Sequence, residues 1–184
     1  MDCTTIVAIG DSLTYGYPYP PEYSWVRTAG DQLGVRMVNK GVCGETTGDM
    51  LRRFAVDVAA LRPDYVIISG GSNDAFLGLA AAEVTGNIAA MASAARTGGI
   101  KTVIGLPPPV DYREESLLAE YRRCLRTCAA ESGLPTIDFH AALVDPAAGG
   151  LRQDLHTDGV HPNEDGYALM AAAAVAALRN LLTR

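Results

Sequence analysis

The 184-residue sequence predicts an α/β fold, in which a five-stranded parallel sheet forms the middle layer of a three-layer α/β/α sandwich. Short apolar runs typical of buried strands alternate with amphipathic helical patterns from one end of the chain to the other. Hydrophobic residues make up 48% of the chain and charged residues 20%, as in globular proteins with a continuous core. This length suits one domain, so we expect residues 1–184 to form a single domain.

The expected strands are apolar runs rich in β-branched residues. In chain order they are Thr4 to Ile9, Val35 to Val42, Tyr65 to Ser69, Thr102 to Leu106, and Thr136 to Phe139. Because a helical pattern follows each run, the strands should lie parallel and be joined by right-handed crossovers. Ligands of such open sheets bind beyond the carboxyl ends of the strands, so residues at those ends are the first candidates for function.

Between the expected strands, apolar residues recur at the spacing of amphipathic helices. These sets are Met50, Leu51, Phe54, Val58 and Leu61, and then Leu117, Leu118, Tyr121, Leu125 and Cys128. An alanine-rich stretch from Ala80 to Arg96 predicts a further helix, closed by Gly98 and Gly99. The last helix is expected to begin at Pro162, a residue suited to the first helical position, and to run toward Leu182.

Composition argues against several classes of partner. The chain has 15 basic and 21 acidic residues, a net charge of −6, whereas a phosphate-binding surface needs positive charge. We therefore expect no nucleic-acid partner. The apolar stretches are too short to cross a bilayer, so no membrane span is expected. The N-terminal Met1-Asp2-Cys3 leads into the first strand without the basic and apolar segments of a secretory signal, which predicts a cytoplasmic location.

The segment from Leu117 onward combines basic residues with cysteines. Arg122, Arg123 and Arg126 are expected on the solvated face of its helix. Cys124 and Cys128 lie four residues apart and are expected at core positions, because the segment offers no further metal ligands. The cysteines of the chain imply no disulfide framework, which fits a reducing compartment.

A candidate nucleophile follows the first expected strand, in the motif Gly10-Asp11-Ser12-Leu13-Thr14. A strand that stops at a glycine can deliver Ser12 to the edge of the sheet, where its hydroxyl can meet a substrate. Serine is a poor nucleophile by itself. It needs a base to take its proton and donors to hold the developing oxyanion.

The candidate base is His161, in the loop Asp158-Gly159-Val160-His161-Pro162 before the last helix. Asp158 can fold back and accept a hydrogen bond from one ring nitrogen, which leaves the other nitrogen facing the serine. His156 is a rival base flanked by aspartates, and His140 follows the fifth strand. We expect both of these histidines to be structural or solvent-exposed.

Oxyanion donors are expected at the ends of the second and third strands. Gly44 lies in the glycine-rich segment after the second strand, where backbone N–H groups can point at a ligand. Asn73, in Gly70-Gly71-Ser72-Asn73-Asp74, can donate its amide into the same space. A simple turn is the alternative interpretation of each segment.

These motifs resemble the four sequence blocks of the SGNH hydrolases, also called GDSL esterases/lipases. The resemblance extends from residue 6 to about residue 180 and includes Gly10 to Leu13, Gly44, Gly71 to Asp74 and Asp158 to Pro162. It implies a flavodoxin-like fold, with Ser12 as nucleophile, His161 as base and Asp158 as its orienting partner. It also implies an oxyanion hole formed by the backbone N–H groups of Ser12 and Gly44 and the side chain of Asn73.

The sequence departs from known hydrolase patterns at two positions. Cys43 stands where many relatives have a serine, and we expect it to be a small buried residue, with a modification site as the alternative. Thr14 stands where a Gly-x-Ser-x-Gly elbow would have its second glycine, which argues against the larger α/β-hydrolase group.

The substrate pocket is expected to involve Asp11, Tyr15, Tyr17 and Phe76, close to the nucleophile or the third block. Tyr19, Tyr23 and Trp25 are further aromatic candidates, although Trp25 in particular can instead anchor the first helix to the sheet. Modest apolar edges weakly favour a short acyl or acetyl group over a long lipid.

The sequence thus predicts a serine-dependent hydrolase of small carboxylic esters that needs no metal or organic cofactor. Activity should rise with pH between about 6 and 7, because the base must be neutral. A thioesterase or an acyltransferase would use the same machinery. A non-catalytic ligand-binding module is the alternative from a different class, and it would have no need of a nucleophile and a base together.

Overall fold

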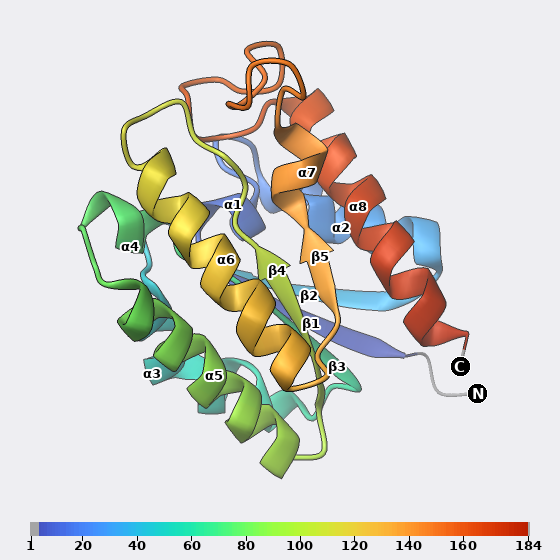
Figure 1. Cartoon of the computed structure of the whole chain (residues 1–184). Helices are drawn as coiled ribbons and strands as arrows, with labels where there is room; N and C mark the ends of the chain where they lie inside the picture. The colour runs from blue at the N-terminus through green and yellow to red at the C-terminus, as the bar shows by residue number, and fades with distance from the viewer. Residues whose placement is uncertain (1–3, 184) are drawn as a thin grey trace.

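The computed structural model describes residues 4–183 and confirms the predicted parallel α/β fold. Its sheet has the strand order β2-β1-β3-β4-β5, and all four pairings are parallel (Figure 1). The strands are β1 (Thr5–Gly10), β2 (Arg36–Gly41), β3 (Tyr65–Ser69), β4 (Lys101–Leu106) and β5 (Thr136–Asp138). The chain before Thr4, including Cys3, lies outside the described residues.

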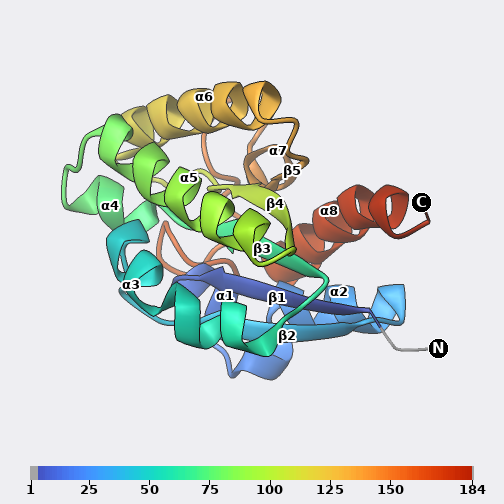
Figure 2. The same cartoon turned by 90° about the horizontal axis from the view of Figure 1, so that it is seen from below.

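Helices cover both faces of this sheet (Figure 2). One face carries α3 (Thr47–Asp57), α5 (Ala81–Thr97) and α6 (Glu115–Glu131), and the other carries α2 (Trp25–Leu33), α7 (Phe139–Leu143) and α8 (Glu164–Leu182). The short helices α1 (Ser12–Tyr15) and α4 (Ser72–Phe76) follow β1 and β3, and η1 (Pro21–Tyr23) and η2 (Ala59–Leu61) are short 3-10 turns. Within residues 4–183, no helix combines the length and apolar character needed to cross a membrane.

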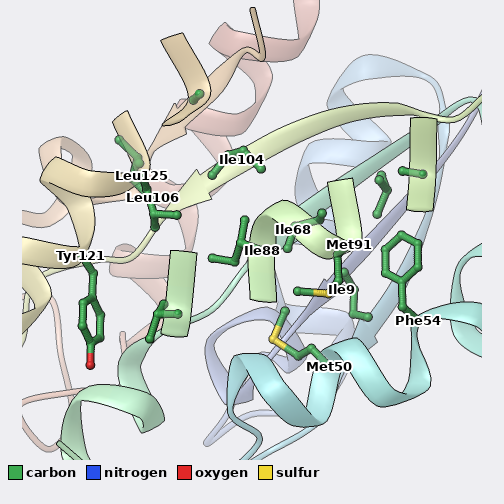
Figure 3. Close-up of a cluster of buried hydrophobic side chains, with 14 of the residues drawn as sticks. Ile9, Met50, Phe54, Ile68, Ile88, Met91, Ile104, Leu106, Tyr121 and Leu125 are labelled. Carbon is green, nitrogen blue, oxygen red and sulfur yellow. The ribbon is translucent and has the colours of Figure 1, made fainter. Parts of the chain in front are cut away.

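Alternation along the strands divides the core into two clusters, one on each face of the sheet. In β1, Val7 and Ile9 face α3, α5 and α6, whereas Ile6 and Ala8 face α2 and α8. Figure 3 shows part of the first cluster, in which Met50 of α3 packs close to Ile9 of β1. Because both faces are covered, the central strands are apolar throughout instead of alternating with polar residues.

The predicted strand limits agree with the structure to within one residue at each end. The start of the last helix was predicted wrongly. Helix α8 begins at Glu164, because the side chain of Asn163 accepts a hydrogen bond from the N–H of Gly166 and so caps the helix. Pro162 instead pairs with His156 in an isolated antiparallel bridge.

Helix α6 departs from the expected pattern of exposure. Arg122 was expected on the solvated face, but it is only 3% exposed. Its guanidinium forms an ion pair with Glu115 and lies 3.4 Å from the carbonyl oxygen of Pro108, so these groups satisfy its charge inside the protein. Cys128, expected in the core, is exposed, whereas Cys124 is partly buried against the core.

Candidate active site

The predicted site residues follow the carboxyl ends of the first three strands of the chain. Ser12 lies just after β1, Gly44 follows β2, and Asn73 follows β3. His161 comes from the loop before α8, and the segment of residues 144–163 lies beyond the same ends of the strands (Figure 1). The sheet topology therefore gathers residues that are far apart in sequence.

Ser12 is the first residue of the short helix α1, and two glycines allow that helix to lie against the strand ends. A Cβ atom at Gly10 would lie 2.1 Å from Oγ1 of Thr14, and one at Gly41 would lie 2.1 Å from the backbone nitrogen of Tyr15. No side chain fits at either position, so the close approach of α1 requires glycine. Ser12 is 8% exposed, which leaves its hydroxyl at the edge of the buried region.

Ser12, His161 and Asp158 form a connected hydrogen-bonded chain. Oγ of Ser12 lies 3.1 Å from Nε2 of His161, and Nδ1 of His161 lies 2.7 Å from Oδ2 of Asp158. With the Nδ1 proton donated to the carboxylate, Nε2 is free to accept the proton of the serine hydroxyl. The structure thus places these three side chains together, in the arrangement expected from sequence.

The turn that carries His161 is held by Asp158 itself. Oδ1 of Asp158 accepts hydrogen bonds from the backbone N–H groups of Val160 and His161, at 3.0 and 2.8 Å. Burial alone would raise the pKa of Asp158, but the hydrogen bonds from His161 and Val160 outweigh it and hold the pKa below its usual value. The carboxylate therefore stays ionised opposite the imidazole.

Two tyrosines contact the histidine loop. The ring of Tyr17 meets the ring of His161 edge to face, with centroids 4.6 Å apart. The hydroxyl of Tyr112 donates to the backbone carbonyl of Asp158 at 2.8 Å. Tyr112 also packs against Phe76, with ring centroids 5.8 Å apart. Tyr112 was not predicted, because nothing in the sequence near it indicates a contact with residue 158.

The other two histidines have different surroundings. His156 accepts the N–H of Gly159 on its Nδ1 at 2.7 Å, so it supports the loop of His161 from within. His140 lies in α7, where burial and then the nearby charge of Arg122 lower its pKa. Both histidines were expected to be structural or solvent-exposed, and His156 has a structural position.

The predicted oxyanion donors have free N–H groups. Among residues 4–183, no protein group accepts a hydrogen bond from the backbone N–H of Ser12 or of Gly44. Nδ2 of Asn73 donates to the carbonyl oxygen of Glu45 at 2.9 Å, and this bond uses one of the two amide protons. The second proton remains available to a ligand.

A buried network holds the Asn73 segment against the start of α3. Asp74 is fully buried, and its two carboxylate oxygens accept the backbone N–H of Thr47 at 3.1 and 3.0 Å. The Thr47 hydroxyl donates to the same carboxylate at 2.6 Å and accepts a hydrogen bond from Asn87. The segments that follow β2 and β3 are therefore tied together beside the candidate oxyanion donors.

The expected substrate-contacting residues differ in exposure. Tyr17 and Phe76 are 44% and 42% exposed, and Tyr15 is partly buried. Asp11 is only 2% exposed and accepts the N–H of Leu13, so its position does not support a direct substrate contact. Burial raises the pKa of Asp11 to about 7, and Oδ2 of Asp11 has no partner within the described residues.

Two further expectations concern side chains near the site. Trp25 is fully buried and packs against Phe139, with ring centroids 4.9 Å apart, so it anchors α2 to the core as its alternative role predicted. Cys43 is exposed, which corrects the expectation of a buried residue, because the segment after β2 turns outward at Val42 and Gly44.

A separate cavity of about 600 Å³ lies between α5 and α6, near the amino ends of β3, β4 and β5. It is lined mainly by apolar side chains, among them Ile88, Ile100 and Leu134. None of the predicted site residues lines it. No cluster of His, Cys, Asp and Glu within residues 4–183 is suited to hold a metal ion.

Comparisons with known proteins identify the family of this chain. A model of the GDSL-like lipase/acylhydrolase family matches residues 8–169. A solved structure assigned to the lipolytic G-D-S-L family, from Desulfitobacterium hafniense DCB-2, has a TM-score of 0.90 at 32% identity and covers 95% of this chain and 99% of that one. Esterase TesA of Pseudomonas aeruginosa is 29% identical over 164 residues, which are 86% of this chain and 79% of that protein.

An acetylxylan esterase of Geobacillus stearothermophilus is 27% identical over 158 residues, 77% of this chain and 71% of that protein. The family match includes all four motifs, from the serine that follows β1 to the histidine that precedes α8. By fold, motif order and extent of the match, this chain belongs to the GDSL-like lipases/acylhydrolases, the SGNH hydrolases.

Proposed function

We propose that this chain is a single-domain esterase in which Ser12 attacks the acyl carbonyl of a carboxylic ester and His161 acts as the base. The observation that carries the proposal is the 3.1 Å contact between Oγ of Ser12 and Nε2 of His161, residues 149 positions apart in the sequence. A base at hydrogen-bonding distance converts an unreactive hydroxyl into a nucleophile. Membership of the acylhydrolase family supports the reaction class.

The reaction proceeds in two half-reactions that use the same groups. In the first, Nε2 of His161 accepts the hydroxyl proton while Oγ of Ser12 bonds to the acyl carbon. His161 then donates this proton to the alcohol oxygen as the ester bond breaks, and the acyl group remains on Ser12. In the second, water attacks the acyl carbon by the same route and releases the acid. Ionised Asp158 stabilises the imidazolium that forms each time.

The oxyanion of each tetrahedral intermediate is held by the backbone N–H groups of Ser12 and Gly44 and by the free amide proton of Asn73. Support comes from the two backbone N–H groups, which have no partner among the described residues, and from the Glu45 carbonyl that orients the Asn73 amide. Donors fixed in advance stabilise the developing charge without reorganisation. Side chains, backbone and water supply every proton and bond, so the mechanism requires no cofactor.

We infer that the substrates are small-molecule esters with short acyl groups. The exposed ring of Tyr17 lies against His161, and the exposed ring of Phe76 lies against Tyr112, so both offer apolar surface to an aryl or acetyl group. The relative from Geobacillus stearothermophilus is named for acetyl ester cleavage, which is consistent with this inference.

The unpaired thiols of Cys43, Cys124 and Cys128 support a reducing, cytoplasmic location.

The test is a panel of aryl and alkyl esters, thioesters and acetylated sugars, assayed with the wild type, Ser12→Ala and the control Ser116→Ala. Ser116 is an exposed serine of α6 outside the site. Ser12→Ala should lose at least about a thousandfold in kcat while Ser116→Ala retains full activity. Ester cleavage that survives in Ser12→Ala would refute the assignment.

Two additions to this panel separate the alternatives. A competing alcohol in the assay diverts the acyl group into a new ester if the chain is an acyltransferase. Preference for thioesters at equal concentration marks a thioesterase. An organophosphonate should add its mass to the wild type and not to Ser12→Ala, whereas a binding module without catalysis would show no such label.

A further inference from the structure

A partly buried arginine of α3 connects the strand ends that carry the site. Arg53 has a side chain only 16% exposed, and its guanidinium makes four hydrogen bonds. Nη2 donates to the carbonyl oxygens of Gly10 and Lys40, at 3.1 and 2.9 Å. Nε donates to Glu45 at 2.6 Å, and Nη1 donates to Asp57 at 3.0 Å.

Two of these bonds fix the ends of neighbouring strands. Gly10 is the last residue of β1 and lies two positions before Ser12, and Lys40 is the penultimate residue of β2. The carbonyl of Gly10 also accepts the N–H of Val42 at 3.0 Å, so one oxygen joins the segment after β2 to the segment that carries the nucleophile. Arg53 donates to the same Gly10 oxygen and so contacts both segments.

The ion pair with Glu45 extends the connection to the third strand. The Glu45 side chain, 19% exposed, binds Arg53, and its backbone carbonyl accepts Nδ2 of Asn73 at 2.9 Å. Glu45 also directly follows Gly44. A contiguous path therefore runs from Arg53 through Glu45 to two of the proposed oxyanion donors.

We propose that Arg53 is a positioning residue for the oxyanion hole, which acts through Glu45 and never touches the substrate. This inference rests on the proposed function. A planar guanidinium can hold two carbonyls and two carboxylates at once in fixed directions, whereas a lysine ammonium is a compact charge without that fork. Loss of Arg53 frees Glu45 to move, and both the Gly44 N–H and the Asn73 amide then lose their alignment.

The experiment compares Arg53→Ala and Arg53→Lys with Arg52→Ala as the matched control. Arg52 is the neighbouring residue on α3, but its side chain is 73% exposed and forms an ion pair with Asp49. Misalignment of catalytic groups by about 1 Å costs on the order of a hundredfold. Arg53→Ala should therefore lose about ten- to a hundredfold in kcat, with KM changed less than about threefold.

Arg53→Lys should recover only part of that loss, and Arg52→Ala should match the wild type. Full kcat in folded Arg53→Ala would overturn the inference. Should Arg53→Ala fail to fold, Glu45→Gln removes the charge pair while keeping the side-chain shape. It should lower kcat in the same way, and an unchanged kcat in Glu45→Gln would equally overturn the inference.

A double-mutant cycle with Asn73→Ala distinguishes positioning from general stabilisation of the fold. If Arg53 acts by aligning the oxyanion hole, Arg53→Ala should cost less kcat in the Asn73→Ala background, where only the Gly44 N–H remains to be misaligned, than in the wild type. Equal losses in both backgrounds would overturn the inference and leave the proposed function intact. Full activity of Asn73→Ala itself would instead refute the proposed oxyanion hole, and with it this role of Arg53.

Discussion

The carboxylate of Asp158 divides its hydrogen bonds between two tasks. Oδ1 accepts two backbone N–H groups and closes the turn, while Oδ2 accepts the ring N–H of His161. One side chain therefore fixes both the backbone that carries the base and the tautomer of its ring. All of these contacts fall within three residues, so the sequence could suggest the pairing, but Asp-x-x-His by itself is equally compatible with a capped turn and a surface histidine.

At Asn73, the prediction concerns one oxyanion donor. Asn73→Ala should lower kcat by about a hundred- to a thousandfold, because a single donor of this kind is worth that much in acyl transfer. Asn180→Ala, at an exposed position of α8, is the control and should leave kcat unchanged. Steady-state kinetics on an activated ester measures both, and circular dichroism confirms that each variant is folded. A loss below about tenfold in Asn73→Ala would contradict the assignment.

At Asp11, the prediction concerns stability against pH. Burial raises its pKa to about 7 in the folded protein, while an unfolded aspartate titrates near pH 3.9. Between these values the folded state binds the extra proton, so the free energy of unfolding should fall as pH rises toward 7. The side chain in Asp11→Asn cannot ionise. Over this pH window, the free energy of unfolding of the wild type should therefore fall by about 2–4 kcal/mol more than that of Asp11→Asn.

Urea titrations of the wild type and Asp11→Asn at pH 5 and pH 8 measure this difference. The asparagine oxygen can still accept the N–H of Leu13, so the cap of α1 is retained. Parallel stability curves for the two proteins would show that Asp11 does not carry the proton.

At the scale of single elements, α1 is the shortest α-helix within residues 4–183. It has four residues, Ser12–Tyr15, and it lies against the strand ends at Gly10 and Gly41. The hydroxyl of Ser24 donates to the carbonyl of Thr14 at 2.7 Å and ties α1 to the start of α2. The position of the nucleophile therefore depends on contacts with β2 and α2 as well as on its own strand.

Gly41→Ala tests whether the close contact between α1 and the end of β2 positions the nucleophile. The added Cβ would lie 2.1 Å from the backbone nitrogen of Tyr15, so helix or strand must shift. We expect a loss of about 1–3 kcal/mol in the free energy of unfolding, together with a large loss of kcat. The control is Gly86→Ala on the exposed side of α5, where a Cβ meets nothing within 4 Å. Gly86→Ala should be neutral or stabilise by up to about 1 kcal/mol, because alanine is the better helix former.

At the scale of the whole molecule, the two core clusters share one sheet. The first cluster packs α3, α5 and α6 on the sheet, and the second packs α2, α7 and α8 on its other face. The strands belong to both clusters, since neighbouring residues of β1 alternate between them. If the helices on one face unfold, the shared strands become exposed, and the helices on the other face lose the sheet against which they pack.

Met91→Ala tests whether the chain unfolds as one unit. Met91 is fully buried in the first cluster, whereas Trp25, the only tryptophan, is fully buried in the second. Met91→Ala should cost about 2–5 kcal/mol. Because we propose a single domain, Trp25 fluorescence and far-UV circular dichroism should move together to the same lower midpoint. Val56→Ala, at a position 74% exposed, is the control and should leave the midpoint unchanged. A fluorescence midpoint that stays in place in Met91→Ala would indicate two independent units.

The sequence by itself determined the strands, most helix positions and the candidate site residues. These depend on local periodicity, on glycines at strand ends and on short motifs such as Asp158-x-x-His161, all of which the chain displays within a few residues. The rule that parallel strands share one carboxyl edge then placed Ser12, Gly44 and Asn73 together. The 3.1 Å contact between Ser12 and His161 brings the loop before α8 to Ser12 as well.

Only the tertiary structure decided which polar residues are buried and what they bind. Arg122 and Arg53 have the same helical context as exposed arginines. Arg122 is nevertheless only 3% exposed, beside Glu115 and the Pro108 carbonyl. Arg53 is 16% exposed, beside the carbonyls of Gly10 and Lys40. Cys43 and Cys128 were expected to be buried, but both are exposed. The physical reason is that burial of a charge depends on partners that folding brings from elsewhere in the chain, and no local pattern encodes them.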